Sequence, residues 1–145
     1  MRRRDAAGRP VPAGSPLAID PLPGRVLPEE ALPAREALAL ARELLAADRP
    51  FYAHDLLEAV WKAAPPHERE LWQGLAQICV GVTHEQRGNL VGAARLLRRG
   101  AGRLEAYVQV SGGRAHGLDV DEVGTTALRL ADALERGLPG PAVTL

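Results

Sequence analysis

The segment Phe51–Trp61 constrains the fold more than any other part of this chain. At the helical period it leaves Asp55, together with Lys62 just beyond it, as the obviously solvent-facing strip, so we expect a central, largely buried helix. His54, Glu58 and Trp61 follow the i, i+4, i+7 spacing that places side chains on one helical face. Two ionisable groups therefore lie beside a large aromatic residue, and this face is the candidate functional site.

A second buried helix is predicted from residue 66 or 67 to Gln86, since no charged residue occurs from Leu71 to Thr83. Glycine inside a helix costs about 1 kcal/mol relative to alanine. Gly74 and Gly81, seven residues apart, therefore predict the close approach of another helix. We expect that neighbour to be the Phe51–Trp61 helix, packed antiparallel across the turn at Pro65.

This pairing predicts a polar cluster between the two helices. Gln77 lies as far after the turn as His54 lies before it, and it shares a flank with the two glycines. The expected cluster is His54, Glu58 and Gln77, with His84 one or two turns further along. Including the adjacent aromatic residue, the predicted ligand-binding residues are His54, Glu58, Trp61, Gln77 and His84.

The remaining patterns predict a single all-α domain, residues 28–138, as a bundle of antiparallel helical hairpins. Asp48, Asn89 and Asp119 are predicted N-caps, and Gly88 and Gly137 are predicted stops. No strand is predicted, and the glycine-rich stretch 111–118 is expected to be a mobile loop. The expected helices are 28–47, from Asp48 to 63, 66–86, 90–110 and from Asp119 to 136.

Two terminal segments complete the predicted organisation. Five prolines interrupt residues 1–23, which removes amide donors and disfavours a packed core. We expect residues 1–27 to form a flexible, undocked tail and residues 139–145 to form a short C-terminal tail.

Composition narrows the possible partners and the compartment. Eighteen basic and eighteen acidic side chains leave no net charge, so nucleic acid and anionic membranes are not expected partners. No stretch approaches the roughly 20 apolar residues of a membrane span, and no export signal follows the N-terminal arginines. Cys79, the single cysteine, lies in an apolar run and is interpreted as a buried thiol in a reducing compartment, which predicts a cytoplasmic protein.

Several motifs in the same order carry a family resemblance. They are His54-Asp55-x-x-Glu58-x-x-Trp61, then Trp72-Gln73-Gly74-Leu75-x-Gln77, then His84 and Arg87-Gly88-Asn89-Leu90-x-Gly92-Ala93. Over residues 35 to 105 the chain resembles the bacterial and archaeal family called domain of unknown function 309. The resemblance implies an all-helical fold and no assigned activity. At position 55 the family more often has Glu, so Asp55 keeps the acid with a shorter reach.

The residues support three interpretations of the polar cluster. Glu58 could accept hydrogen bonds from His54 and Gln77 in a structural network, which is the interpretation we favour. His54 could act as an acid or base oriented by Glu58 in a ligand or catalytic pocket. His54 and Glu58 could instead share a divalent metal with His84, although the second His of a zinc-protease helix is missing.

The sequence therefore predicts a non-enzymatic protein that binds a partner protein or small molecule at this cluster, with no cofactor. The alternative is a small metal-dependent or acid–base enzyme, hydrolase-like, that uses His54, Glu58 and His84. Gly88-Asn-Leu-x-Gly-Ala-Ala is also similar to the second part of a tetratricopeptide-type hairpin, which keeps peptide binding open. Whether the protein is an enzyme, and its oligomeric state, are left open.

Overall fold

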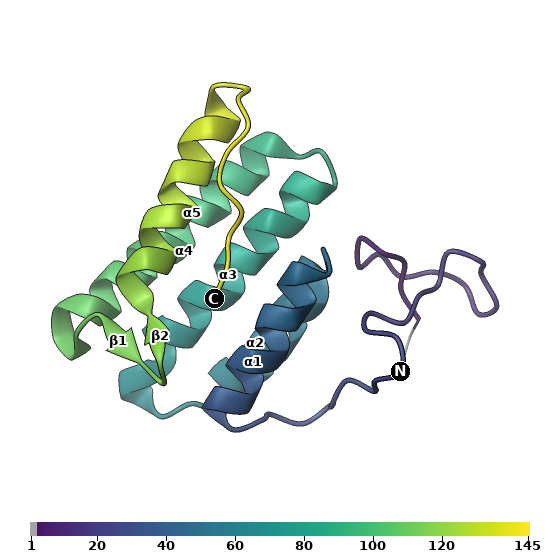
Figure 1. Cartoon of the computed structure of the whole chain (residues 1–145), viewed down its shortest axis with the longest axis horizontal. Helices are drawn as coiled ribbons and strands as arrows, with labels where there is room; N and C mark the ends of the chain where they lie inside the picture. Colours follow the sequence, from purple (N-terminus) through teal and green to yellow (C-terminus); the bar gives the residue numbers. More distant parts are fainter. Residues whose placement is uncertain (1–2) are drawn as a thin grey trace.

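A computed structural model describes residues 3–145, and its ordered elements are almost entirely helical (Figure 1). The all-α prediction is confirmed. The helices are α1 (Ala34–Ala46), α2 (Pro50–Ala63), the short 3₁₀ helix η1 (Pro66–Glu68), α3 (Arg69–Gln86), α4 (Leu90–Ser111) and α5 (Val120–Glu135). No α-helix in residues 3–145 is long and apolar enough to cross a membrane.

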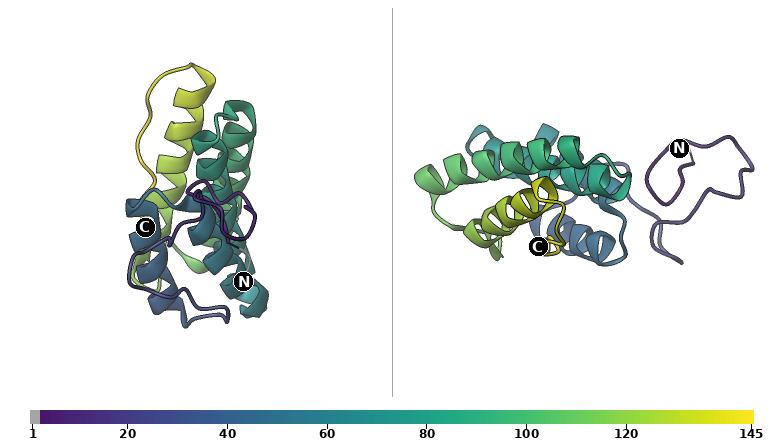
Figure 2. Two further views of the ribbon diagram at one scale, coloured as in Figure 1. Left: turned by 90° about the vertical axis from the view of Figure 1, so that its right-hand side faces the viewer. Right: turned by 90° about the horizontal axis from the view of Figure 1, so that it is seen from above.

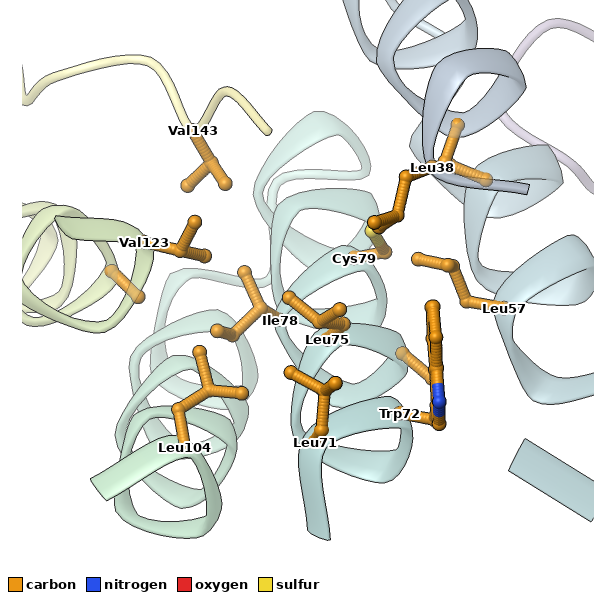
Figure 3. Close-up of a cluster of buried hydrophobic side chains, with 14 of the residues drawn as sticks. Leu38, Leu57, Leu71, Trp72, Leu75, Ile78, Cys79, Leu104, Val123 and Val143 are labelled. Atoms are coloured by element: carbon orange, nitrogen blue, oxygen red, sulfur yellow. The ribbon is translucent and has the colours of Figure 1, made fainter. Parts of the chain in front are cut away.

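Each helix packs mainly against its neighbour in the sequence, and α3 lies at the centre of the series between α2 and α4 (Figures 1 and 2). The connections are short, which favours antiparallel neighbours. Figure 3 shows that α3 packs against other helices on both sides. Leu57 of α2 lies beside Trp72, and Leu104 of α4 lies on the other side of α3. Trp72 and Leu71 are 1% and 0% exposed, so α3 is the core helix of the fold.

The glycines of α3 face α4, and the predicted contact with α2 is wrong. A Cβ atom added to Gly74 would lie 2.9 Å from the carbonyl oxygen of Gly100, and one added to Gly81 would lie 2.9 Å from Cγ of Leu97. Such distances are shorter than ordinary carbon contacts, so both glycines are needed for the approach of α4. The glycine pattern correctly predicts a close helix pair, but it does not say which helix is the partner.

Two of the three predicted helix N-caps form in the structure. Asn89 Oδ1 accepts from the Gly92 amide at 3.0 Å, and Asp119 Oδ1 accepts from the Glu122 amide at 3.0 Å, so both predicted N-caps are confirmed. The first helix begins at Ala34 with Pro33 at the N-cap position, six residues later than predicted. Asp48 has a φ of 58° and makes no cap, and Arg49 takes the N-cap position of α2.

The stretch predicted to be a mobile loop contains a small hairpin. Strand β1 (Arg114–Ala115) pairs antiparallel with β2 (Leu118–Asp119), so the prediction of no strand is wrong. The two residues between them, His116 and Gly117, have φ values of 51° and 82°. Positive φ at both positions is typical of a tight two-residue hairpin turn, and histidine is one of the non-glycine residues enriched in that conformation.

The N-terminal segment contacts the helices instead of being undocked. Tyr52 Oη donates to the carbonyl oxygen of Asp5 at 3.0 Å, and the Arg87 guanidinium donates to that of Ala7 at 2.8 and 3.1 Å. The guanidinium carbon of Arg4 lies 4.5 Å from the centre of the Phe51 ring. Residues 4–11, which we call the arm, therefore cover the first turn of α2 and the end of α3.

The glycines of α4 give a matched test of the α3–α4 contact. A Cβ on Gly100 would lie 2.7 Å from the carbonyl oxygen of Gly74, whereas one on Gly102 would meet nothing within 4 Å. We expect Gly100→Ala to lower the free energy of unfolding by about 1–3 kcal/mol through overpacking. Gly102→Ala should raise it by about 0.5–1 kcal/mol because alanine is the better helix former. Denaturant unfolding measures both, and equal effects would contradict the contact.

A second matched pair tests the docking of the arm. Gly8 and Gly14 both have positive φ, but a Cβ on Gly8 would overlap the Phe51 side chain whereas one on Gly14 meets nothing within 4 Å. We expect Gly8→Ala to detach the arm and to speed amide hydrogen exchange in residues 5–11, because the backbone can no longer lie on the ring. Gly14→Ala carries the same φ strain and should leave that exchange unchanged. Fast exchange in the unmodified chain would show that the arm is undocked.

Candidate functional site

The exposed side of α2 carries a row of paired charges. His54 Nε2 lies 2.8 Å from Glu58 Oε2, and Lys62 Nζ lies 3.0 Å from Glu58 Oε1. Each pair is four residues apart, so the helix itself brings the groups together. The exposed fractions of the side chains rise along the row, from 17% for His54 to 34% for Glu58 and 67% for Lys62. This charged row is therefore a surface feature with its inner end partly buried.

Both carboxylate oxygens of Glu58 are used within the row. The hydrogen bond from Lys62 lowers the pKa of Glu58 below its ordinary value, and the charge of His54 and its hydrogen bond act in the same direction against partial burial. Glu58 is therefore an anion at neutral pH, since its pKa lies below the usual carboxyl range. A carboxylate held by two donors orients His54 well but is a poor proton acceptor.

The other nitrogen of His54 differs from the rest of the row. Nδ1 is buried and makes no hydrogen bond within the described residues. The imidazole ring lies 5.5 Å from the Phe51 ring, which Arg4 of the arm also contacts. A buried polar atom without a partner costs about 1–3 kcal/mol, so this nitrogen is the atom of the site whose position most needs an explanation.

Gln77 and His84 do not join His54 and Glu58. Gln77 Oε1 accepts from Arg103 Nε of α4 at 3.1 Å, because its flank of α3 faces α4. His84 Nδ1 lies 2.9 Å from Asn89 Nδ2, at the end of α3. The predicted cluster of His54, Glu58 and Gln77, with His84 further along, is therefore wrong, and only the i, i+4 pair of His54 and Glu58 forms a contact.

The same geometry separates the candidate metal ligands. Among residues 3–145, no three His, Cys, Asp or Glu side chains form a group that could hold a metal ion. His54, Glu58 and His84 are therefore not placed as a three-ligand site. Trp61, the remaining predicted site residue, is partly buried and packs against the hydrophobic core at the edge of the α2 face.

A second polar cluster was not predicted. Glu68 Oε1 accepts from Trp72 Nε1 at 3.0 Å and lies 2.8 Å from His116 Nε2. Burial alone would raise the pKa of Glu68, but the hydrogen bonds from His116 and Trp72 outweigh it and the pKa lies below its ordinary value. The spacing of Glu68 and Trp72 could have suggested the first contact. His116 is 48 residues away in the sequence, and no local signal marks the second.

Cavities lie on other parts of the surface. One of about 720 Å³ lies between α1 and the segment before it, lined by residues that include Val26, Leu32 and Leu40. Another of about 430 Å³ lies between the ends of α1 and α3 and the C-terminal segment. Neither of these two cavities is lined by His54, Glu58 or Trp61.

Comparison with known proteins finds a family match in the central part of the chain. Residues 38–96 match the family described as Domain of unknown function (DUF309), which confirms the resemblance over α1 to the first part of α4. The uncharacterized protein YpuF of Bacillus subtilis (strain 168) is 39% identical over 57 residues, 39% of this chain. The match spans about a third of YpuF, 33% of its length. No solved structure matches.

Glu58 and Glu68 should differ in their contribution to stability. Trp72 is 1% exposed, so Glu68→Ala leaves a buried indole N–H without its acceptor and should cost about 1–3 kcal/mol. Glu58→Ala removes pairs whose members are partly exposed, and its loss should stay below about 1 kcal/mol. Urea unfolding of both variants measures the difference. A larger loss for Glu58→Ala would place that residue in a buried network.

Proposed function

We propose that this chain, whose residues 38–96 match the DUF309 family, is a non-enzymatic binding domain that contacts a partner protein through the exposed face of α2. One observation carries the proposal. His54 and Glu58 form a row with Lys62 on one face of α2, flanked by the half-buried rings of Phe51 and Trp61, and none of these side chains lines either cavity described above.

The chemistry of this face suits protein recognition. Aromatic side chains are enriched in protein interfaces and supply most of their hot spots. The contacts of Glu58 with His54 and Lys62 orient these side chains, so a partner meets a partly pre-organised pattern. Asp55 is exposed next to His54 in the sequence and adds a further acidic group. A partner surface with complementary basic and apolar groups fits this pattern.

The proposed compartment is the cytoplasm. Cys79 is a free, fully buried thiol on the α3 helix, and burial raises its pKa to about 12. Such a thiol stays protonated at neutral pH and is chemically inert. A chain whose single cysteine has no disulfide role fits a reducing compartment.

A second candidate is acid–base chemistry at His54, and the buried Nδ1 without a partner favours it. A polar ligand that reached this nitrogen would satisfy it while Glu58 held the opposite side of the ring. The alternative differs from the binding proposal because it requires a small molecule at the inner end of the row. Mass spectrometry of untagged protein under native conditions, together with metal analysis, detects a retained ligand or ion and would favour this candidate.

A photo-crosslinking amino acid placed in turn at two exposed positions tests the binding proposal in cells. Position 55 lies on the α2 face, and position 109 lies on α4 away from the row. We expect one discrete protein adduct from position 55, and none of the same mass from position 109. Replacing Glu58 by Gln in the same chain should abolish the adduct without unfolding the protein.

Other outcomes decide against the proposal. An adduct that forms equally from both positions shows non-specific contact. An adduct that survives Glu58→Gln together with Trp61→Ala places the partner on another surface. Circular dichroism of each variant confirms that a lost adduct reflects the surface and not the fold.

A further inference from the structure

Arginine side chains from three separate segments gather around the start of α2. Arg4 and Arg9 belong to the arm. Arg49 occupies the N-cap position of α2, and Arg87 is the C-cap residue of α3. The guanidinium carbons of Arg4 and Arg87 lie 4.5 and 5.7 Å from the centre of the Phe51 ring, so both groups share one aromatic side chain. We call the four arginines the arginine cluster.

Arg49 is held at the same place by its neighbours. The carbonyl oxygen of Asp48 accepts from Gln86 Nε2 at 2.9 Å and from Arg49 Nη1 at 3.2 Å. The turn before α2 therefore lies against the end of α3. Burial raises the pKa of Tyr52, and the charges of Arg4 and Arg49 oppose that rise, so both guanidinium groups act on one side chain.

No ion pair neutralises the arginine cluster. Within residues 3–145, none of its four members lies within salt-bridge distance of an Asp or Glu carboxylate. Burial lowers the pKa of the Arg87 guanidinium, and the charges of Arg9 and Arg4 lower it further, whereas Asp5 acts against them. One oxygen of Asp5 already accepts from two amides of the arm, at 2.8 and 3.0 Å. Like charges are therefore held together with little compensation.

The start of α2 adds to the positive charge of this region. Acidic residues normally suit the first turn of a helix, because its N-terminal end carries a partial positive charge. The first turn of α2 has no acidic residue, and Arg49 makes no side-chain cap. Arg49 Nε is buried and makes no hydrogen bond within the described residues, which is costly for a charged donor. Asp48 and Glu85, the acids nearest to the cluster in the sequence after Asp5, line the cavity beside the C-terminal segment.

We propose that the arginine cluster binds a phosphate group. Guanidinium groups bind phosphate through paired, charge-assisted hydrogen bonds. A phosphate monoester carries nearly two negative charges and three acceptor oxygens, whereas a carboxylate carries one charge. Each guanidinium has five N–H donors, and the carbonyl oxygens of Ala7 and Gly8 engage only two on Arg87 and one on Arg4. The phosphate is either a free ligand or part of a phosphorylated side chain of a partner protein. The proposal does not rest on the contact proposed for the α2 face.

Titration of the ¹⁵N-labelled full chain with inorganic phosphate, at constant ionic strength, tests the proposal by NMR. The Nε–H resonance of Arg49 reports on the buried donor, and that of Arg95, which is exposed on α4, is the internal control. We expect saturable shifts at Arg49 and at the amides of residues 51 and 52, with none at Arg95. Arg49→Gln and Arg9→Gln should each weaken binding at least about tenfold, because each removes a charged donor. Arg95→Gln removes the same charge elsewhere and should leave binding unchanged.

A peptide of glycine and serine with a single phosphoserine distinguishes the two sources of phosphate. Tighter binding of this peptide than of inorganic phosphate supports a phosphorylated partner, and equal or weaker binding supports a free ligand. The same peptide with glutamate in place of phosphoserine is the control, and equal affinity for it would overturn the choice of phosphate.

Three further results decide against a phosphate site. Shifts that grow linearly with added phosphate, or that are equal at Arg49 and Arg95, would show charge screening alone. An equal loss of affinity in Arg95→Gln and Arg9→Gln would show that no particular arginine is required. Circular dichroism checks each fold, and because Arg9 is exposed, Arg9→Gln decides the matter even where Arg49→Gln does not fold.

Discussion

The close approach of α3 and α4 is the constraint on which the rest of this structure depends. Gly74 and Gly100 place backbone against backbone, with a hypothetical Cβ on either residue under 3 Å from the other's carbonyl oxygen. Because this flank of α3 is committed to α4, α2 must pack on the flank that carries Trp72 (Figure 3). The polar face of α2 is then left outside the helix pair. The accessibility of His54 and Glu58 is thus set by glycines on another helix.

The sequence predicted what depends on local spacing and failed where a neighbour had to be chosen. His54 and Glu58 are one turn apart on a single helix, and the caps at Asn89 and Asp119 act within three residues, so each follows from local geometry. Gln77 of α3 is predicted to face α2, because the glycines on its flank indicate a close helix without identifying which helix it is. The contact of Glu68 with His116 depends on a hairpin turn 48 residues away in the sequence, and no local spacing signals a contact over that separation.

At both ends of the chain, too, the sequence predicts local structure but not the contacts that a segment makes. Proline-rich composition correctly predicts that no helix forms in residues 3–27, but composition does not predict what an extended backbone touches. The arm lies on Phe51 and Arg87, and Val143 of the predicted C-terminal tail enters the core cluster. Extended segments can dock through a few side-chain contacts and hydrogen bonds to carbonyl oxygens, which leave no periodic pattern. The α2 face that we propose for binding borders the arm, so it has a neighbour in cis that a partner must accommodate.

The account's central claim is that the glycine flank of α3 belongs to α4 and leaves the α2 face free. Nuclear Overhauser effects from the Hα protons of Gly74 measure this contact directly in the full chain. The structure predicts strong effects to the Hα protons of Gly100 and to the side chain of Leu104. Effects from Gly74 to the side chain of Glu58, without any to Gly100, would show that α2 occupies this flank and would contradict the account.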